Sequence, residues 1–299
     1  MNFALHILKL VNGQGLLTIS DISKIVCCSK VIRNLVQTDS DYWPRIIVLK
    51  LHVRNTDSII QSFHRYKQVW LGKLFRLNVY DISCVHLATL MMMVSSRIHS
   101  IHFQYNLNRS SHVRFTLDNT MRERFDSLIT LDVSRCNVGH TFIRDISFLT
   151  RLQNLNISAC HSVSDINIPL IHRLKQLTYL NMSECDSISG TSFQYFPQSL
   201  TSLNISSWKG CNVITYDHLR PIAGLKHIYA KGININHGFL LACSQLSNLK
   251  HIDFSFSEFQ DQTSLLTLSL SNSCCLESIN LSHSRNFSNV GMYYVSQIP

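Results

Sequence analysis

A six-residue phrase, Leu-x-x-Leu-x-apolar, recurs along most of this 299-residue chain and constrains its fold more than any other feature. A typical copy reads Leu152-Gln-Asn-Leu155-Asn-Ile157, and Ile replaces Leu in some others. Copies begin at residues 74, 98, 128, 152, 177, 200, 225, 249 and 276, so successive copies start 23 to 30 residues apart. A near-constant period in the twenties predicts one structural unit that is repeated and stacked along the chain.

The phrase and its spacing resemble the leucine-rich repeat. The resemblance implies that each copy forms a short strand, a turn and a helical return segment, and that neighbouring copies must stack to bury their apolar faces. Side chains alternate along a strand, so the apolar residues of the phrase point inward and those between them point outward. We therefore predict an α/β fold, a leucine-rich-repeat solenoid of horseshoe form with a parallel sheet on its concave face. Such an extended surface favours a protein partner over a small substrate.

The same repeat accounts for three of the ten cysteines. Cys136, Cys160 and Cys185 each stand three residues after the last apolar residue of their phrase, which resembles the cysteine-containing subclass of leucine-rich repeats. Later copies depart from this pattern, and the residues in that place are Trp208, Ile233, Ser257 and Ser284. We expect buried structural thiols. No metal site is expected, because the sequence contains no Cys-x-x-Cys pair.

The second half of several repeats predicts capped helices. Ser, Asp or Asn precedes apolar residues at three-to-four spacing in segments 164–174, 188–193, 214–219 and 287–295. We assign residues 46–299 to the repeat array. No capping segment follows 287–295, so we expect the chain to be a piece of a longer protein.

Composition and motifs exclude several classes of function. The formal charge of +9 favours acidic partners, but no basic run or motif typical of nucleic-acid binding is found. Apolar runs are far shorter than the roughly 20 residues that span a bilayer, and no signal-peptide cleavage site is evident. No catalytic, phosphate-binding or zinc motif occurs. We therefore expect no enzyme activity, no cofactor and no membrane or nucleic-acid partner, and a location in the cytoplasm, the nucleus or both.

Residues 1–45 do not follow the repeat and are expected to form two or three short helices. They resemble an F-box: the segment Leu17-Thr-Ile-Ser-Asp21-Ile22 matches the family's Leu-x-x-x-Asp-Leu step, and Asp39 and Trp43 match its closing phrase. The family's leading Leu-Pro-x-Glu is absent, and Ile32 replaces its helix tryptophan. The resemblance implies a surface that binds the Skp adaptor, with the candidate contacts Leu5, Ile7, Leu8, Ile22, Ile25 and Val26. A helical cap that covers the open end of the array is the alternative.

An F-box followed by cysteine-type repeats resembles the F-box/leucine-rich-repeat family. Those proteins are substrate receptors of SCF (Skp–cullin–F-box) ubiquitin ligases. The resemblance implies that residues 1–45 recruit the Skp adaptor and cullin complex while the repeats hold a protein target. A second, shorter resemblance, over 59–79, is to members associated with the ciliary dynein regulatory complex. It leaves open a non-ubiquitin scaffold or interaction protein, axonemal in location.

Two outward columns of the phrase suggest where a target would bind. The fifth place is mostly Asn or Asp and the seventh is mostly Ser, which we interpret as structural consensus on a solvated face. Tyr229 and Lys231 break both columns in one copy. Because exposed aromatic residues commonly anchor protein interfaces and the local charge is positive, we predict that an acidic or phosphorylated target binds here. The candidate target-binding residues are Tyr179, His227, Tyr229, Lys231, His251, Phe256 and His283. The alternative is an irregular repeat with a solvated face.

Overall fold

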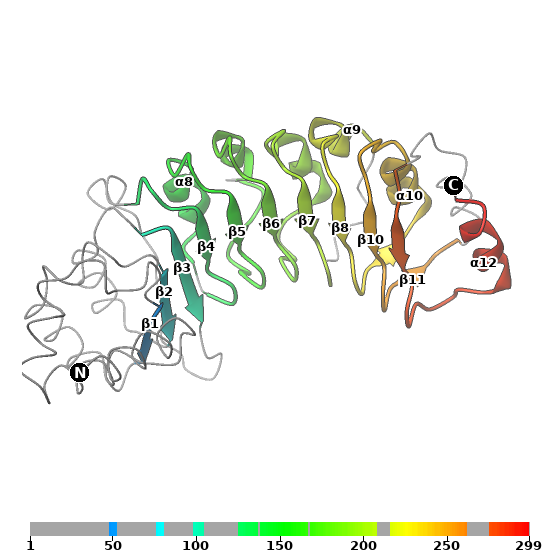
Figure 1. Ribbon diagram of the computed structural model, residues 1–299, viewed down its shortest axis with the longest axis horizontal. Helices are drawn as coiled ribbons and strands as arrows, with labels where there is room; N and C mark the ends of the chain where they lie inside the picture. The colour runs from blue at the N-terminus through cyan, green and yellow to red at the C-terminus, as the bar shows by residue number, and fades with distance from the viewer. Residues whose placement is uncertain are drawn as a thin grey trace, which may run out of the picture. The chain divides into compact units, whose positions relative to one another are not determined.

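The computed structural model describes residues 48–52, 76–80, 98–104, 125–136, 138–166, 168–207, 216–261 and 275–298 (Figure 1). The chain divides into two compact units, residues 1–132 and 133–299. The F-box-like segment, with its candidate adaptor contacts Leu5, Ile7, Leu8, Ile22, Ile25 and Val26, lies outside the described residues.

The described residues of the first unit form four parallel strands in sequence order. They are β1 (Val48–His52), β2 (Arg76–Tyr80), β3 (Ser100–Gln104) and β4 (Thr130–Asp132). The register aligns Leu49, Leu77, Ile101 and Leu131, which are equivalent places of successive copies. Ile101 and Leu131 are fully buried. The repeats of this unit therefore stack as the phrase predicts, and β1 adds a copy ahead of the one at Leu74.

The second unit contains six parallel strands that pair in the order β5-β6-β7-β8-β10-β12. Their bounds are β5 (Asn154–Asn156), β6 (Tyr179–Asn181), β7 (Ser202–Asn204), β8 (His227–Tyr229), β10 (His251–Asp253) and β12 (Ser278–Asn280). A small parallel sheet pairs β9 (Asn234–Ile235) with β11 (Glu258–Phe259). Each large-sheet strand belongs to one repeat, so outward residues of equivalent place lie in rows across the sheet.

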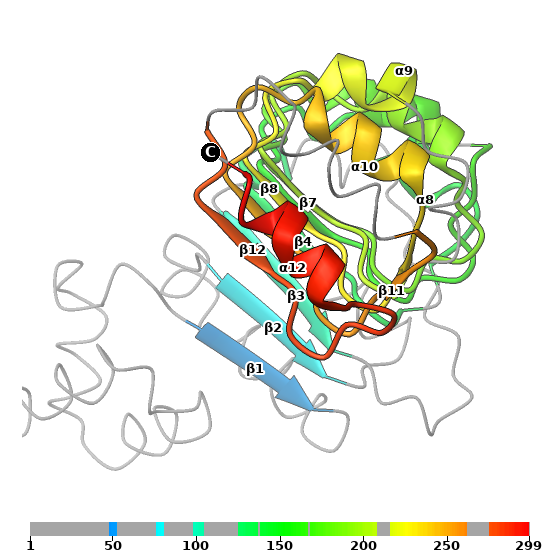
Figure 2. The same ribbon diagram turned by 90° about the vertical axis from the view of Figure 1, so that its right-hand side faces the viewer.

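The helical segments of the described residues are α8 (Phe142–Ile146), η3 (Ile168–Arg173), η4 (Gly190–Tyr195), α9 (Tyr216–Leu219), η6 (Arg220–Ile222), α10 (His237–Ser244) and α12 (Asn289–Val295). In the view along the repeats, α8, α9 and α10 lie across from the strands (Figure 2). Among the described residues, none of the helices combines the length and apolar character needed to cross a membrane.

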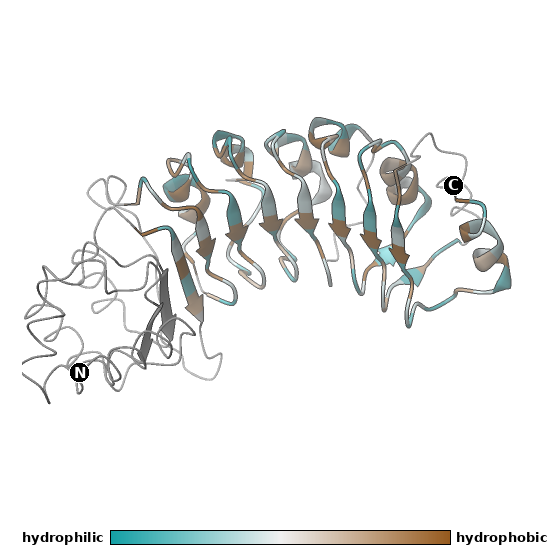
Figure 3. Cartoon of the chain, in the orientation of Figure 1, coloured by the Kyte–Doolittle hydropathy of each residue, from teal (hydrophilic) through white to brown (hydrophobic). Residues whose placement is uncertain are grey.

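The core of the second unit is built from the inward places of the phrase. Leu155, Leu180 and Leu203 are at most 1% exposed, and the residues on either side of each are half-buried. Hydropathy alternates accordingly along the strands (Figure 3). Full burial of a leucine side chain contributes about 1.5–3 kcal/mol. The period-two pattern thus fixes which residues remain free to meet a partner.

The segment 164–174, for which a capped helix was predicted, forms the 3-10 helix η3 over Ile168–Arg173. Both carboxylate oxygens of Asp165 accept the Ser189 N–H of the next repeat at 3.0 Å, and one also accepts the Ser192 hydroxyl. The prediction for 287–295 is confirmed, since Ser288 Oγ accepts the Val290 N–H at the start of α12.

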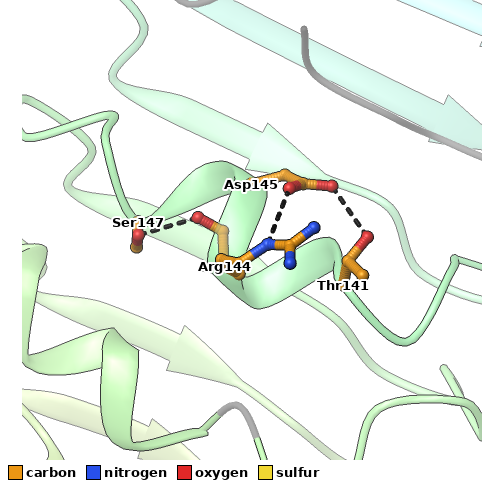
Figure 4. A network of polar contacts seen from close by, with 4 residues as sticks. All are labelled: Thr141, Arg144, Asp145 and Ser147. Carbon is orange, nitrogen blue, oxygen red and sulfur yellow. Dashed lines mark hydrogen bonds and ion pairs between the residues drawn. The ribbon is translucent and has the colours of Figure 1, made fainter.

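Helix α8 carries a buried carboxylate that is satisfied within the helix (Figure 4). Asp145 is 5% exposed, accepts the Thr141 hydroxyl at 2.9 Å and lies 3.5 Å from Arg144 Nε. The Ser147 hydroxyl closes the helix end by donating to the Arg144 carbonyl at 2.8 Å. A buried charge is costly unless it is paired. These contacts therefore explain why helix α8 tolerates a buried acidic residue.

The buried cysteines form a ladder of thiol hydrogen bonds between repeats. Cys160 Sγ donates to the Val133 carbonyl and Cys185 Sγ to the Ile157 carbonyl, each at 3.1 Å. Burial raises the pKa of the Cys185 thiol from 9.0 to about 11, which keeps the donated proton in place. The prediction of buried structural thiols is confirmed for Cys136, Cys160 and Cys185.

The ladder continues with serine where the cysteine pattern stops. Ser257 Oγ donates to the Ala230 carbonyl and Ser284 Oγ to the Phe254 carbonyl, both at 2.9 Å. These are the equivalent donors and acceptors in later repeats. Ser257 and Ser284 are therefore not departures from the repeat chemistry, since a hydroxyl supplies the same proton as a thiol.

In the copies that begin at residues 128 to 276, the eighth place adopts the left-handed conformation. These residues, with φ between 54° and 69°, are Arg135, Ala159, Glu184, Ser207, Gly232, Phe256 and His283. The conformation lets the N–H of that residue reach the next repeat, as Ala159 N does with the Ser183 carbonyl at 2.8 Å. Left-handed geometry costs about 1–2 kcal/mol for a residue other than glycine. Among these residues, only Gly232 adopts it without that cost.

Candidate protein-binding surface

The outward residues of β6 to β12 form two rows across the sheet, which we call the strand face. One row holds the third place of each phrase and the other the fifth. In order, the rows are Tyr179, Ser202, His227, His251 and Ser278, and Asn181, Asn204, Tyr229, Asp253 and Asn280. Neighbouring strands lie about 4.8 Å apart. The structure therefore brings His227, Tyr229 and His251 together, whereas Ser202 separates Tyr179 from His227.

The Asn and Asp side chains of the fifth row are structural. Each Oδ1 accepts the N–H of the residue two places on, at 2.9–3.1 Å, which fixes the turn at the end of the strand. The residues that do this are Asn156, Asn181, Asn204, Asp253 and Asn280. These hydrogen bonds support the interpretation of this column as structural.

Tyr229 cannot accept this turn hydrogen bond. Its ring lacks an oxygen at the position of the Asn side-chain amide, and the Lys231 N–H donates instead to Ser206 Oγ of the preceding repeat at 3.2 Å. The Tyr229 side chain remains 39% exposed. The fold thus loses the turn hydrogen bond of this place, and the tyrosine stays accessible to a partner.

Tyr229 belongs to a group of rings, the ring cluster, with His227 and His251. The His227 and His251 rings stack with centroids 4.8 Å apart and planes at 13°. The Tyr229 ring lies 6.5 Å from that of His227, at 8°. Partial burial, with the nearby charges of His251 and Lys226, lowers the pKa of His227. The neutral form of His227 is therefore favoured near neutral pH.

One edge of the ring cluster is closed by an ion pair that sequence reasoning missed. Lys250 Nζ donates to Glu277 Oε1, and the other Glu277 oxygen lies 3.6 Å from His251 Nε2. His251 Nδ1 also contacts Ser278 Oγ at 2.8 Å. The pairing raises the pKa of Lys250 and lowers that of Glu277. Both residues occupy the second place of adjacent copies, and this shared place was the sequence signal for the pair.

A second group, the turn cluster, consists of Lys231, Phe256 and His283. The Phe256 and His283 rings stack with centroids 4.7 Å apart, and Lys231 Nζ lies 4.6 Å from the centre of the Phe256 ring. Phe256 and His283 were expected on the concave strand surface, and this placement was wrong. Both occupy the left-handed turn position beyond the strand, because the phrase ends two residues earlier.

The charges around the two clusters are unevenly paired. Lys250 is matched by Glu277, whereas Lys226 and Lys231 have no carboxylate within 4.0 Å in the part of the chain that the structure describes. Over the same residues, no group of three His, Cys, Asp or Glu side chains is arranged to hold a metal ion. The surface thus combines exposed rings with two unpaired cations, a combination suited to binding.

Comparisons with known proteins identify the fold. No family model and no curated protein matches the sequence. Among solved structures, the Toll-like receptor TLR13 in a complex with a single-stranded RNA is 17% identical, with a TM-score of 0.57, over 84% of this chain and 34% of that one. A leucine-rich-repeat protein of Leptospira interrogans is 15% identical, with a TM-score of 0.54, over 90% of this chain and 62% of that one. The chain thus spans only part of the length of these proteins.

An internalin from Listeria monocytogenes is also similar, at 13% identity and a TM-score of 0.50, over 82% of this chain and 79% of that one. At these identities the likeness concerns the fold alone. Together with the stacked strands, it shows that the protein is a leucine-rich-repeat solenoid.

Proposed function

We propose that the chain is the substrate-recognition subunit of an SCF-type ubiquitin ligase. In this proposal residues 1–45 bind the Skp adaptor, and the repeats bind a protein target. The F-box resemblance of 1–45 and the leucine-rich-repeat fold of the following residues support it in that order along the chain. The protein positions a target and catalyses nothing itself, and it acts in the cytoplasm, the nucleus or both.

The observation that carries target binding is the exposure of rings that the fold does not need. Tyr229 is 39% exposed at a place where other repeats gain a turn hydrogen bond, and Phe256 is 52% exposed at a left-handed place. Exposed aromatic residues are the commonest energetic anchors of protein interfaces. The proposed target-binding residues are Tyr179, His227, Tyr229, Lys231, His251, Phe256 and His283.

Adaptor binding tests this function most simply. The full chain is co-purified with the Skp adaptor of its own species, beside a variant with Ile22→Asp and Ile25→Asp. The proposal predicts stoichiometric adaptor with the unaltered chain and loss with the variant, because buried charges in an apolar contact are strongly unfavourable. A Tyr229→Ala variant serves as a control and should retain the adaptor. Absence of adaptor from the unaltered chain would refute the ligase role.

The second candidate is a non-ubiquitin scaffold of the axoneme. The short resemblance over residues 59–79 to proteins associated with the dynein regulatory complex favours it. It predicts that target capture through the strand face persists although no adaptor binds, so the co-purification separates the two functions.

A further inference from the structure

Phe256 occupies a position that is unfavourable for the isolated protein. Its φ of 59° lies in the left-handed region, where a bulky side chain is a marked exception. The equivalent residues in other repeats are small or polar, as with Ala159, Ser207 and Gly232. Strained, exposed residues persist mainly where they serve function. A phenylalanine that is 52% exposed adds little to the core.

The neighbours of Phe256 define what kind of group can meet it. Lys231 comes from the preceding repeat and His283 from the following one, so the ring is flanked along the array by an ammonium group and an imidazole. With its faces occupied, the ring offers its edge to a partner. A nucleic-acid base needs a free ring face on which to stack, whereas an apolar side chain can pack against an edge.

The charge around the ring indicates the sign of the partner. Lys231 Nζ lies 4.6 Å from the centre of the Phe256 ring and has no carboxylate within 4.0 Å among the residues that the structure describes. The neighbouring acids are already engaged: Asp253 Oδ1 accepts the Ser255 N–H at 2.9 Å, Glu258 Oε1 accepts from Asn286 at 3.1 Å, and Glu277 pairs with Lys250. A lysine without a carboxylate partner beside an apolar ring edge is complementary to a carboxylate beside an apolar side chain.

We infer that the turn cluster of Lys231, Phe256 and His283 is the anchor site for an acidic segment of a partner protein in which carboxylates flank an apolar residue. The inference rests on the proposed function, because it takes the repeats to be the target-binding part of the chain. A carboxylate of the segment meets Lys231, and the apolar side chain packs against the edge of Phe256.

Fluorescence anisotropy of the full chain tests the inference with a labelled short peptide of Glu and Asp around one Leu. The first control peptide replaces the acids with Gln and Asn. We expect the acidic peptide to bind at least about tenfold more tightly than this control at low salt and to lose most of that advantage at high salt. Lys231→Ala with Phe256→Ala should weaken binding of the acidic peptide about tenfold.

Two further variants exclude trivial explanations. Lys231→Met removes the charge but keeps the apolar stem of an exposed residue, so it should fold and weaken binding about threefold. Arg135→Ala removes a cation from the same left-handed turn position of another repeat and should leave binding unchanged. Equal binding of the acidic peptide to the Lys231 variants and the unaltered chain would overturn the inference.

Other occupants are outcomes of the same titration. Tighter binding of a phosphoserine peptide alone, of a short single-stranded RNA alone, or of a second unlabelled copy of the chain would also overturn it. Failure here with intact adaptor binding would leave the ligase role standing. Success here without adaptor binding would leave only a scaffold with an acidic partner.

Discussion

Ser257 provides the sharpest test of how the repeats are joined. Its hydroxyl donates to the Ala230 carbonyl at 2.9 Å and accepts the Ile233 N–H at 3.2 Å. Ser257, Ala230 and Ile233 are all at most 2% exposed. Ser257→Ala therefore leaves a buried N–H and a buried carbonyl each one partner short. At about 1–3 kcal/mol for a buried group that loses its partner, we expect the free energy of unfolding to fall by about 3 kcal/mol.

Urea unfolding followed by far-ultraviolet circular dichroism measures this loss. Ser257→Cys retains a donor of the kind found at Cys160 and Cys185 and should cost about half as much, because a thiol is a weak acceptor for the Ile233 N–H. The exposed Ser247→Ala is the matched control and should change stability by less than about 0.5 kcal/mol. If Ser257→Ala were as mild as Ser247→Ala, the hydroxyl ladder would not stabilise the array.

Three further predictions concern the same unit. Because burial raises the pKa of the Cys185 thiol from 9.0 to about 11, the folded protein should lose stability as the pH rises through this range. The loss should be about 2–3 kcal/mol. The Cys185→Ser variant should lack this part of the loss when urea unfolding is measured at each pH. Leu203→Ala, at a residue 1% exposed, should cost about 3–5 kcal/mol in the same assay, whereas Thr201→Ala nearby should cost much less. Gly232→Ala places a side chain at φ 69° and should cost about 1 kcal/mol, with an unchanged adaptor contact in co-purification as the control.

The strands and core were predictable because their signal is local and periodic. Leu155, Leu180 and Leu203 recur at nearly equal spacing, and the period-two alternation of a strand decides which residues they leave exposed. The cysteine ladder was read correctly for the same reason. Its continuation through Ser257 and Ser284 could not be seen from residue type, because serine differs from cysteine. The two residues share a side-chain proton donor at the ninth place of the copy.

The details of the candidate surface depended on contacts between repeats that no single copy contains. The position of Phe256 followed from the left-handed conformation of the eighth place, which the phrase itself does not specify. The Asp165 carboxylate accepts the Ser189 N–H of the next repeat, a contact that its own copy does not contain. The ion pair between Glu277 and Lys250 depends on the strand register, which places the two residues side by side.

We propose that two separate parts of the chain bind the two partners: residues 1–45 bind the adaptor, and the strand face and turn cluster bind the target. Amide hydrogen exchange of the full chain, with and without purified Skp adaptor, tests it most directly. The account predicts adaptor-induced protection within 1–45 and unchanged exchange in β8, β10 and the turn that contains Phe256. Protection of β8 and β10 by the adaptor, or no protection anywhere, would contradict it.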